Sequence, residues 1–481
     1  MSITMQPTPT SHLRFGIGSV DVTPPVGIYH PMWGAARHHR ATGVHRPLYG
    51  DVMLFAPLHD DAGSWAQVQL DFVGLAAADH AAVRATVADA LGLAPSQVVV
   101  SFSHSHAAGL FSPDRVHLPG GEMIIPYLAE VRAKLADAAA TARTNLAECY
   151  LTYAIGRCTL AANRDYFDDD RGIYACGFNP GAPADDTLLV VRAASPTGEL
   201  RALVVNYACH PTTLAWDNTL ISPDYIGALR AEVQAVAGVP CVFTQGASGD
   251  LGPRHGFVGD PKVADANGRQ VAFAALAALA SMDPPAHDFA YAGPVVSGAT
   301  LGTWLPVAFT EERRAAVTPF AGGEFSVELP QKPRPDPAQL EQELAVFLAQ
   351  QAEADRAGDA IAARDFGARA ERARRWLGRL KNLPAGPTYP FHFSVRRMGD
   401  GFWVSVGGEP YNLLQRELRS RFPAYPMVVT ELASDLSVAY LLPRERYGVG
   451  RYQEEPSILA PGCLEQLIDA VSAQLRALGA G

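Results

Sequence analysis

Polar side chains that could do chemistry stand directly after apolar runs at four places in the sequence. They are His104 and His106 after Val98–Phe102, His210 after Leu203–Cys209, Asp250 after Val242–Gly249, and Glu409 after Phe402–Gly408. Imidazole is both the commonest metal ligand and the commonest proton carrier near neutral pH. Two or three imidazoles with a carboxylate form a zinc-like donor set, whereas a hard cation would prefer oxygen ligands alone. The residue types therefore indicate metal binding or proton transfer.

The histidine pair is the most compact of these groups. Val98–Phe102 is apolar and mostly β-branched, which is typical of a buried strand. Residues two apart in an extended backbone point to the same side, so His104 and His106 could face one site. The alternative is that backbone groups bind both imidazoles at the mouth of a loop, and that Asp250 and Glu409 are ordinary turn residues near glycines. Taken together, the four groups favour a metal site.

No thiolate cluster competes for this role. The six cysteines (149, 158, 176, 209, 241 and 463) contain no CxxC spacing and are interpreted as small buried hydrophobic residues. Other catalytic motifs are missing from the sequence: there is no phosphate-binding loop, Gly16-x-Gly18 lacks the third glycine of a dinucleotide site, and Ser248 is not in a G-x-S-x-G motif.

The elements that must position these groups follow from apolar periodicity. In open α/β sheets, ligands gather beyond the carboxyl ends of the strands, so four strand ends are expected to contribute to one crevice. The pattern predicts strands at 13–22, 52–57, 66–75, 98–102, 149–155, 188–193, 202–207, 240–244, 402–406 and 427–430, and helices at 77–91, 127–146, 225–236, 263–281 and 463–478. The expected fold class is α/β, with mixed sheets flanked by helices and a helical hairpin insertion.

The 481 residues divide into three expected parts. Residues 1–12 are interpreted as a disordered lead, residues 13–287 as the main α/β part, and residues 288–481 as a second part that completes the site. Within the second part, 338–380 is predicted to be a helical hairpin with its turn near Gly358, whose apolar stripe is a packing surface.

Charge and hydropathy exclude several classes of protein. With 49 acidic and 39 basic residues and a formal charge of −10, the chain is not expected to bind nucleic acid. No run approaches the roughly 18 apolar residues that a membrane helix needs. The first ten residues show no charged and apolar pattern of a signal peptide, so a cytoplasmic location is expected.

A series of motifs, in order along residues 14–460, resembles the neutral/alkaline (non-lysosomal) ceramidase family, specifically its N-terminal catalytic domain. The motifs are Gly16–Thr23, Gly43–Tyr49, Ser103–His106, Asn163-Arg164, Asn206–Thr213, Gln245–Pro253, Gly407–Pro410, and a tail with Ser434-Asp435, Tyr440, Tyr447 and Arg451-Tyr452. Full-length members carry a further immunoglobulin-like domain for which this sequence has no counterpart. Gly252 also stands where the family has a serine.

The resemblance implies a single zinc ion held by two histidines, a glutamate and a tyrosine. Carried over by position, the metal ligands would be His104, His210, Glu409 and Tyr440, with Tyr447 as a rival for the tyrosine position. His106, Arg164 and Tyr452 would line the substrate side as catalytic groups, and Asp250 is placed with them. Members of the family hydrolyse the amide of an N-acylated sphingoid base.

The predicted function is a zinc-dependent hydrolase of an amide bond with one Zn²⁺ per chain. His106 would act as general base and then acid, while Arg164 or Tyr452 would donate to the developing oxyanion. Two alternatives stay open: the same metal hydrolase acting on a small soluble amide, lactam or ester, and a non-catalytic binding protein on the same scaffold. The partner is a small-molecule or lipid-like amide, and the oligomeric state is left open.

Overall fold

A curved eight-stranded sheet forms the centre of the molecule. The structure is a computed structural model that describes residues 4–480. The strands lie in the order β14-β12-β11-β7-β2-β4-β5-β6. Their bounds are β2 Thr10–Asp21, β4 Tyr49–Ala56, β5 Trp65–Leu70, β6 Val98–Phe102, β7 Ala147–Arg157, β11 Thr187–Ala194, β12 Leu200–Tyr207 and β14 Cys241–Gln245. Only the two edge pairs, β5 with β6 and β12 with β14, are parallel. The edge strands β6 and β14 approach each other, so the sheet curls back on itself.

Four helices cover one face of this sheet. They are α1 Ala77–Leu91, α2 Ile124–Thr144, α3 Tyr225–Ala237 and α4 Pro261–Ala280. α1 and α2 bury apolar residues against β4, β5 and β6, while α3 and α4 pack against β11, β12 and β14. These helices agree with the predicted ranges, because their apolar periodicity is set locally.

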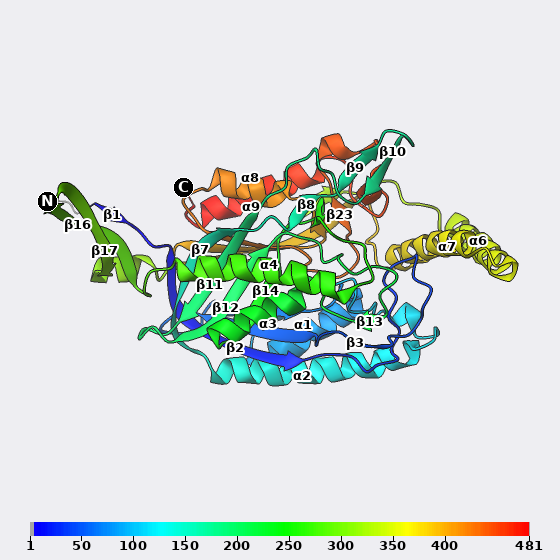
Figure 1. The fold of residues 1–481 in the computed structure, drawn as a ribbon. Coiled ribbons are helices and arrows are strands. Elements are labelled where there is room, and N and C mark those ends of the chain that lie inside the picture. The colour runs from blue at the N-terminus through cyan, green and yellow to red at the C-terminus, as the bar shows by residue number, and fades with distance from the viewer. Residues whose placement is uncertain (1–3, 481) are drawn as a thin grey trace.

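The opposite face of the sheet packs against a second sheet. That sheet has the order β18-β19-β20-β22, with β18 Phe320–Pro330, β19 Thr388–Met398, β20 Gly401–Val406 and β22 Met427–Thr430. Trp403 and Val428 of the second sheet are buried against Phe55 and Trp65 of the first. Helices α8 Leu413–Arg421 and α9 Cys463–Ala477 cover its outer face, so the layers are helix, sheet, sheet, helix (Figure 1). The expected mixed α/β fold is confirmed.

A helical hairpin leaves the second sheet, as the sequence predicts. It consists of α6 Pro337–Ala357 and α7 Ala360–Leu380, and the turn lies at Gly358, whose φ of 72° favours glycine. Pro330 of β18 lies opposite Thr388 of β19, so residues 331–387 leave the sheet and return to it at one point. In Figure 1 the hairpin projects from one end of the molecule.

A β-arm projects from the other end (Figure 1). It comprises β1 Met5–Gln6, β16 His287–Ser297 and β17 Ala299–Ala308, followed by helix α5 Glu311–Ala316. The disordered lead expected for residues 1–12 is wrong from Met5 onward, because Met5 and Gln6 pair with Ala290 and Phe289 and Thr10 begins β2. The pairing partner lies far away in the sequence, so local composition could not reveal it. Residues 1–3 lie outside the described residues.

Four short two-stranded sheets complete the fold and arrange the loops at the site. They are β3 Gly43–Val44 with β13 Leu220–Ile221, β8 Ala161–Asn163 with β15 Leu251–Pro253, β9 Asp165–Asp168 with β10 Ile173–Cys176, and β21 Glu409–Pro410 with β23 Tyr440–Leu441. No helix within residues 4–480 combines the length and apolar character needed to cross a membrane.

Candidate metal centre

Three histidines converge beyond the strand ends where β6, β12 and β14 meet. The imidazole ring centroids of His104 and His106 lie 4.8 Å apart, and those of His104 and His210 lie 4.7 Å apart. The nitrogen atoms of all three rings that could bind a metal lie within 4.8 Å of one another. The first histidine pair follows one edge of the central sheet and His210 follows the strand beside the other edge, so the curl of the sheet brings them together.

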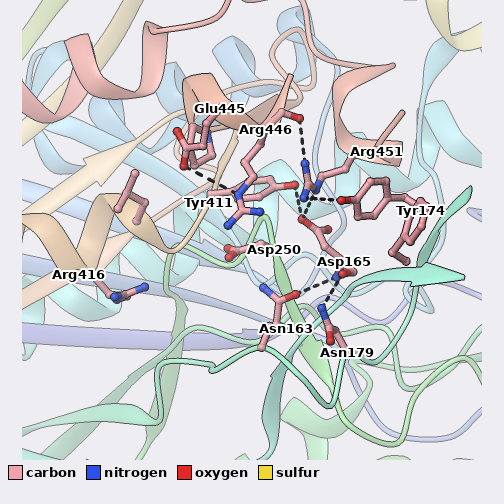
Figure 2. Close-up of a pocket in the computed structure, with 14 residues that line it drawn as sticks. Asn163, Asp165, Tyr174, Asn179, Asp250, Tyr411, Arg416, Glu445, Arg446 and Arg451 are labelled. Atoms are coloured by element: carbon pink, nitrogen blue, oxygen red, sulfur yellow. Dashed lines mark hydrogen bonds and ion pairs between the residues drawn. The ribbon is translucent and has the colours of Figure 1, made fainter. Parts of the chain in front are cut away.

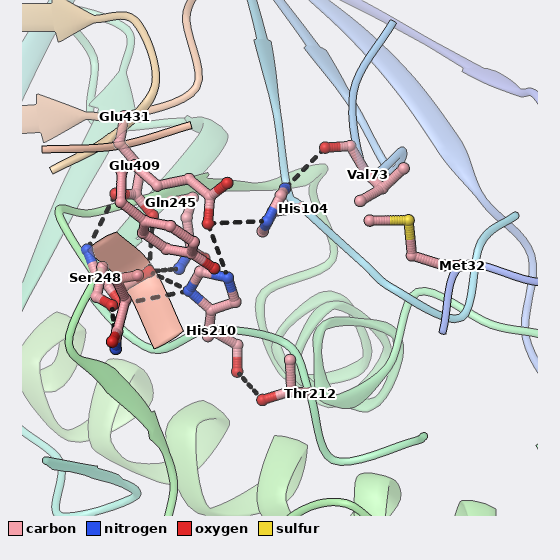
Figure 3. Close-up of polar contacts among 12 residues, drawn as sticks. Met32, Val73, His104, His210, Thr212, Gln245, Ser248, Glu409 and Glu431 are labelled. Atoms are coloured by element: carbon pink, nitrogen blue, oxygen red, sulfur yellow. Dashed lines mark hydrogen bonds and ion pairs between the residues drawn. The ribbon is translucent and has the colours of Figure 1, made fainter. Parts of the chain in front are cut away.

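The backbone at His104 differs from the extended conformation expected for the His-x-His pair. His104 has a φ of 64°, in the left-handed region that residues with a side chain rarely adopt. Its N–H donates to the Phe72 carbonyl at 2.9 Å, and its Nδ1 lies 2.7 Å from the Val73 carbonyl oxygen. A turn held by the segment after β5, rather than strand alternation, therefore aims Nε2 of His104 into the cluster (Figure 3).

Glu409 supplies a carboxylate to the same point. Its Oε2 lies 3.4 Å from Nε2 of His104 and 3.2 Å from Nε2 of His210. Glu409 lies in β21, directly opposite Tyr440 in β23, so a short parallel pairing fixes these two residues as neighbours. Gly249 allows the chain to pass close to them, because a Cβ there would lie 2.6 Å from the carbonyl oxygen of Glu409.

Several buried polar atoms of the cluster make no hydrogen bond with any described residue. Among residues 4–480, no hydrogen bond is made by Nε2 of His210, Oε2 of Glu409, or either ring nitrogen of His106. Buried polar atoms almost always have partners, and a bound ion is one accepted reason for an exception. Two imidazole nitrogens and a carboxylate oxygen aimed at one point are a donor set that suits a divalent transition metal.

The charge states of these side chains match that interpretation. Burial lowers the pKa of His210 to about 3, with Arg164 adding to the effect, so the imidazole is neutral and able to coordinate. Burial alone would raise the pKa of Glu409, but His104 and His210 outweigh it and hold that pKa well below its usual range. The group therefore presents a neutral imidazole at His210 and an ionised carboxylate at Glu409.

A network that the sequence analysis missed orients His210. Nδ1 of His210 lies 3.1 Å from Oγ and 3.2 Å from the carbonyl oxygen of Ser248. The Ser248 hydroxyl donates to Glu431 at 2.6 Å, its N–H donates to the same carboxyl group at 3.0 Å, and Gln245 Nε2 donates to its Oγ at 2.7 Å (Figure 3). Burial raises the pKa of Glu431 well above its usual range. Glu431 follows the strand at 427–430, so the strand-end pattern could have identified it.

Tyr440 and Arg164 form one wall of the site. The Tyr440 ring lies 6.3 Å from that of His210, and Nη2 of Arg164 donates to the Tyr440 hydroxyl at 3.2 Å and to the Gly249 carbonyl at 2.7 Å. Tyr447, the rival tyrosine, lies elsewhere: its hydroxyl donates to the Leu459 carbonyl at 3.2 Å. Tyr452 is 50 % exposed, with its ring 5.8 Å from that of Tyr440. The structure therefore places Tyr440, Arg164 and Tyr452 together and Tyr447 apart.

An aromatic wall lies beside His106, and its residues were not predicted from the sequence. The Trp33 ring lies 4.9 Å from that of His106, 6.2 Å from Trp216 and 5.6 Å from Phe257. Trp33 belongs to the His-rich and aromatic segment at 29–39, where no chemistry was predicted.

Asp250 is not brought into contact with the imidazoles, contrary to the expectation that it shares their crevice. Its Oδ1 accepts the backbone N–H of Asn412 at 2.7 Å, and it lines a separate cavity of about 400 Å³. Figure 2 shows Asp250 in that cavity together with Asp165, Tyr411 and Arg451. Burial raises the pKa of Asp250 to about 6. The Asp250 carboxyl group thus holds the backbone at Asn412, in the loop that follows Glu409.

The comparison with solved structures shows which known fold this chain shares. No protein-family model matches the sequence, and no curated protein is significantly similar to it. Two solved structures are similar with a TM-score of 0.63 over 98% of this chain. One is a ceramidase complexed with C2, at 15% identity over 76% of that chain, and the other is the neutral ceramidase from Pseudomonas aeruginosa, at 16% identity over 75% of that chain. The predicted resemblance is therefore confirmed for the fold, and this chain has the architecture of the neutral ceramidase structures.

Proposed function

We propose that this protein is a zinc-dependent hydrolase of an amide bond. One Zn²⁺ per chain would be held by His104, His210, Glu409 and Tyr440. The observation that carries the proposal is the convergence of Nε2 of His104 and His210 on Oε2 of Glu409, within 3.4 Å, with no hydrogen bond to satisfy the buried carboxylate oxygen. Zinc prefers nitrogen ligands with a carboxylate, and catalytic zinc sites keep a position open for water.

The surrounding contacts support a zinc site rather than a chance cluster. Metal-ligating histidines usually donate their second ring N–H to a carbonyl or carboxylate, which fixes the tautomer. Nδ1 of His104 has the Val73 carbonyl and Nδ1 of His210 has Ser248 for this purpose. Both imidazoles are thereby oriented with Nε2 toward the common point.

The chain's own residues supply the remaining chemistry. Zn²⁺ bound here would make hydroxide available near neutral pH and polarise the amide carbonyl. His106, whose ring nitrogens have no hydrogen-bond partner within residues 4–480, would accept a proton from the attacking water. As the water oxygen bonds to the carbonyl carbon and the C–N bond breaks, His106 would deliver that proton to the leaving nitrogen.

Arg164 and Tyr452 would stabilise the negative charge that develops on the carbonyl oxygen. Arg164 is buried and anchored by the Gly249 carbonyl, so its guanidinium is held in place before substrate arrives. Removal of one such donor typically costs about 3–4 kcal/mol of transition-state stabilisation. Because the solved structures that share the fold are ceramidases, the amide of an N-acylated amine is the first substrate class to test.

The proposal is tested by zinc content and hydrolysis measured on the same preparations. We expect one zinc ion per chain by elemental analysis, and release of amine from at least one member of a panel containing ceramide and small soluble amides. His210→Ala and Glu409→Ala should lose both zinc and activity, whereas Tyr447→Phe should keep both. Full activity without metal would refute the proposal, as would zinc-loaded protein that hydrolyses no amide.

A further inference from the structure

Helix α7 of the helical hairpin lies against both loops that border the metal centre. Arg375 donates to the carbonyl oxygen of Met32, the residue before Trp33. One helical position later, Nε1 of Trp376 donates at 2.8 Å to Glu455, in the loop that carries Tyr452. The last turns of α7 therefore connect the aromatic side of the site to its tyrosine side.

The anchoring of α7 is ionic and leaves an excess of positive charge. Glu371 binds Arg115 through two contacts of 2.8 Å and also contacts Arg374 and Arg375, each at 2.8 Å. Glu371 thus contacts three guanidinium groups, and in the described part of the chain only that of Arg115 has a further acidic partner, Asp114 at 3.3 Å. This excess contrasts with the net charge of −10 of the whole chain.

Arg379 lies one turn beyond Arg375 on the same helix and forms no ion pair with any residue among 4–480. Its guanidinium carbon lies 5.1 Å from the centre of the Trp376 ring. Its Nε is buried, and no hydrogen bond or ion pair to its guanidinium is present in the part of the chain that the structure describes. Glu455, the nearest acidic side chain on the neighbouring loop, is taken by Trp376 and by Arg372 at 3.7 Å.

Arg379 lies on the same face of α7 as Arg375, because residues four apart on a helix are neighbours. Burial lowers the pKa of Arg379, and the charges that act on it include Glu455, Arg375, Tyr452 and Glu409. Because Arg375 on this face donates to the carbonyl of Met32, the face that carries Arg379 is turned toward the loops that border the metal centre. Arg164 supplies a further positive charge on the Tyr440 side of the centre.

We propose that the substrate carries an anionic group, and that Arg379 binds this group while the amide lies at the metal centre. This inference rests on the proposed function and specifies its substrate class: an amide with an apolar portion for the wall of Trp33, Trp216 and Phe257, and a carboxylate for α7. The planar guanidinium of arginine can bind a carboxylate through two N–H groups. Because Arg379 has no ion pair among residues 4–480 to break, its binding of a substrate carboxylate carries little cost.

The test compares two probes of similar size and different charge: N-hexanoylglycine, with a free carboxylate, and N-hexanoylglycinamide, which is neutral, and it follows cleavage of the hexanoyl amide in both. For the zinc-loaded protein we expect a lower KM for the carboxylate. Arg379→Gln should raise that KM about tenfold, as expected for a lost charged hydrogen bond, and leave the KM for the neutral amide unchanged. Arg379→Lys should recover part of the loss. Arg364→Gln, on the same helix but paired with Asp365, is the matched control and should change neither value.

Calorimetric titration of metal-free protein provides a readout independent of catalysis. N-hexanoylglycine should bind more tightly than the neutral amide, and the difference should vanish in Arg379→Gln. If neither probe nor ceramide is hydrolysed but this difference in binding is found, the hydrolase proposal fails and the anion site stands. Any of three results would overturn the anion site. They are equal KM and equal binding for the two probes, an unchanged KM for the carboxylate in Arg379→Gln, and a preference for neutral ceramide over the carboxylate.

Discussion

Ser248 offers the sharpest test of how the site is built, because its hydroxyl has three contacts and touches no substrate in the proposed reaction. Its Oγ receives the Nδ1–H of His210 at 3.1 Å and the amide of Gln245 at 2.7 Å, and donates to Glu431 at 2.6 Å. In Ser248→Ala, His210 loses one acceptor but keeps the Ser248 carbonyl oxygen at 3.2 Å.

The magnitude follows from that remaining contact. Loss of a group that orients a metal ligand typically weakens metal binding about 10- to 100-fold. Because one acceptor for Nδ1 survives, we expect the lower end, about a tenfold weaker zinc affinity, or about 1.4 kcal/mol. The metal-free variant should also lose about 1–3 kcal/mol of unfolding free energy, because Gln245 and Glu431 are left with unsatisfied buried groups.

Two measurements check this expectation: a zinc titration against a chromophoric chelator, and urea unfolding of the metal-free protein. Thr430→Val is the matched control, since its hydroxyl is buried beside Glu431 but has no hydrogen-bond partner within residues 4–480. It should leave zinc affinity unchanged and keep or raise stability. The reasoning would be refuted if Ser248→Ala bound zinc as tightly as the parent protein, or if Thr430→Val weakened zinc binding equally.

Three further predictions concern the surroundings of the site. Gly249→Ala should weaken zinc binding, because the new Cβ would displace the Glu409 carbonyl. Gly252→Ala should leave zinc binding unchanged, because its Cβ would meet its nearest neighbour at 3.6 Å, an ordinary van der Waals distance. Equal zinc affinities of the two variants in a titration would contradict this. Tyr440→Phe should weaken zinc binding, while Tyr447→Phe should cost only about 1 kcal/mol of stability in urea unfolding, with zinc affinity as the discriminating measurement. Burial opposes ionisation of Glu371, but Arg375 and Arg115 outweigh it and lower its pKa to about 2, so its stabilising effect is complete above the unfolded pKa and is lost as pH falls. The stability deficit of Glu371→Gln, about 3 kcal/mol at pH 7, should therefore narrow as pH falls below about 4.5; a deficit that is constant with pH would refute the ion-pair account.

Local patterns predicted much of the secondary structure. The strand at Val98–Phe102 and the helix at Ala77–Leu91 have the predicted bounds, and the hairpin turns at Gly358 as expected. Apolar periodicity and turn-forming residues are encoded within a few positions, so a short window suffices. The first strand of the β-arm was missed because Met5 and Gln6 are ordered only by pairing with β16, some 280 residues later in the chain.

The residues of the candidate site were likewise predicted only in part. His104, His210 and Glu409 were identified because each follows an apolar strand. The same pattern also selected Asp250, but the structure places Asp250 in a different cavity. Glu431 was not predicted, although it follows a strand and binds Ser248 beside the site. A strand-end rule finds where polar groups emerge, but it does not specify the direction in which the following loop turns.

The sequence by itself determined which donors are available: imidazoles and carboxylates at the ends of apolar segments, in an acidic chain with no cysteine cluster, and a tyrosine that the family resemblance implies. Only the tertiary structure decided that they meet. The central sheet curls until its edges approach, His104 takes a left-handed turn, and β21 pairs with β23, so residues hundreds of positions apart share one point in space. Side-chain chemistry is a property of single residues, whereas convergence depends on packing between distant segments.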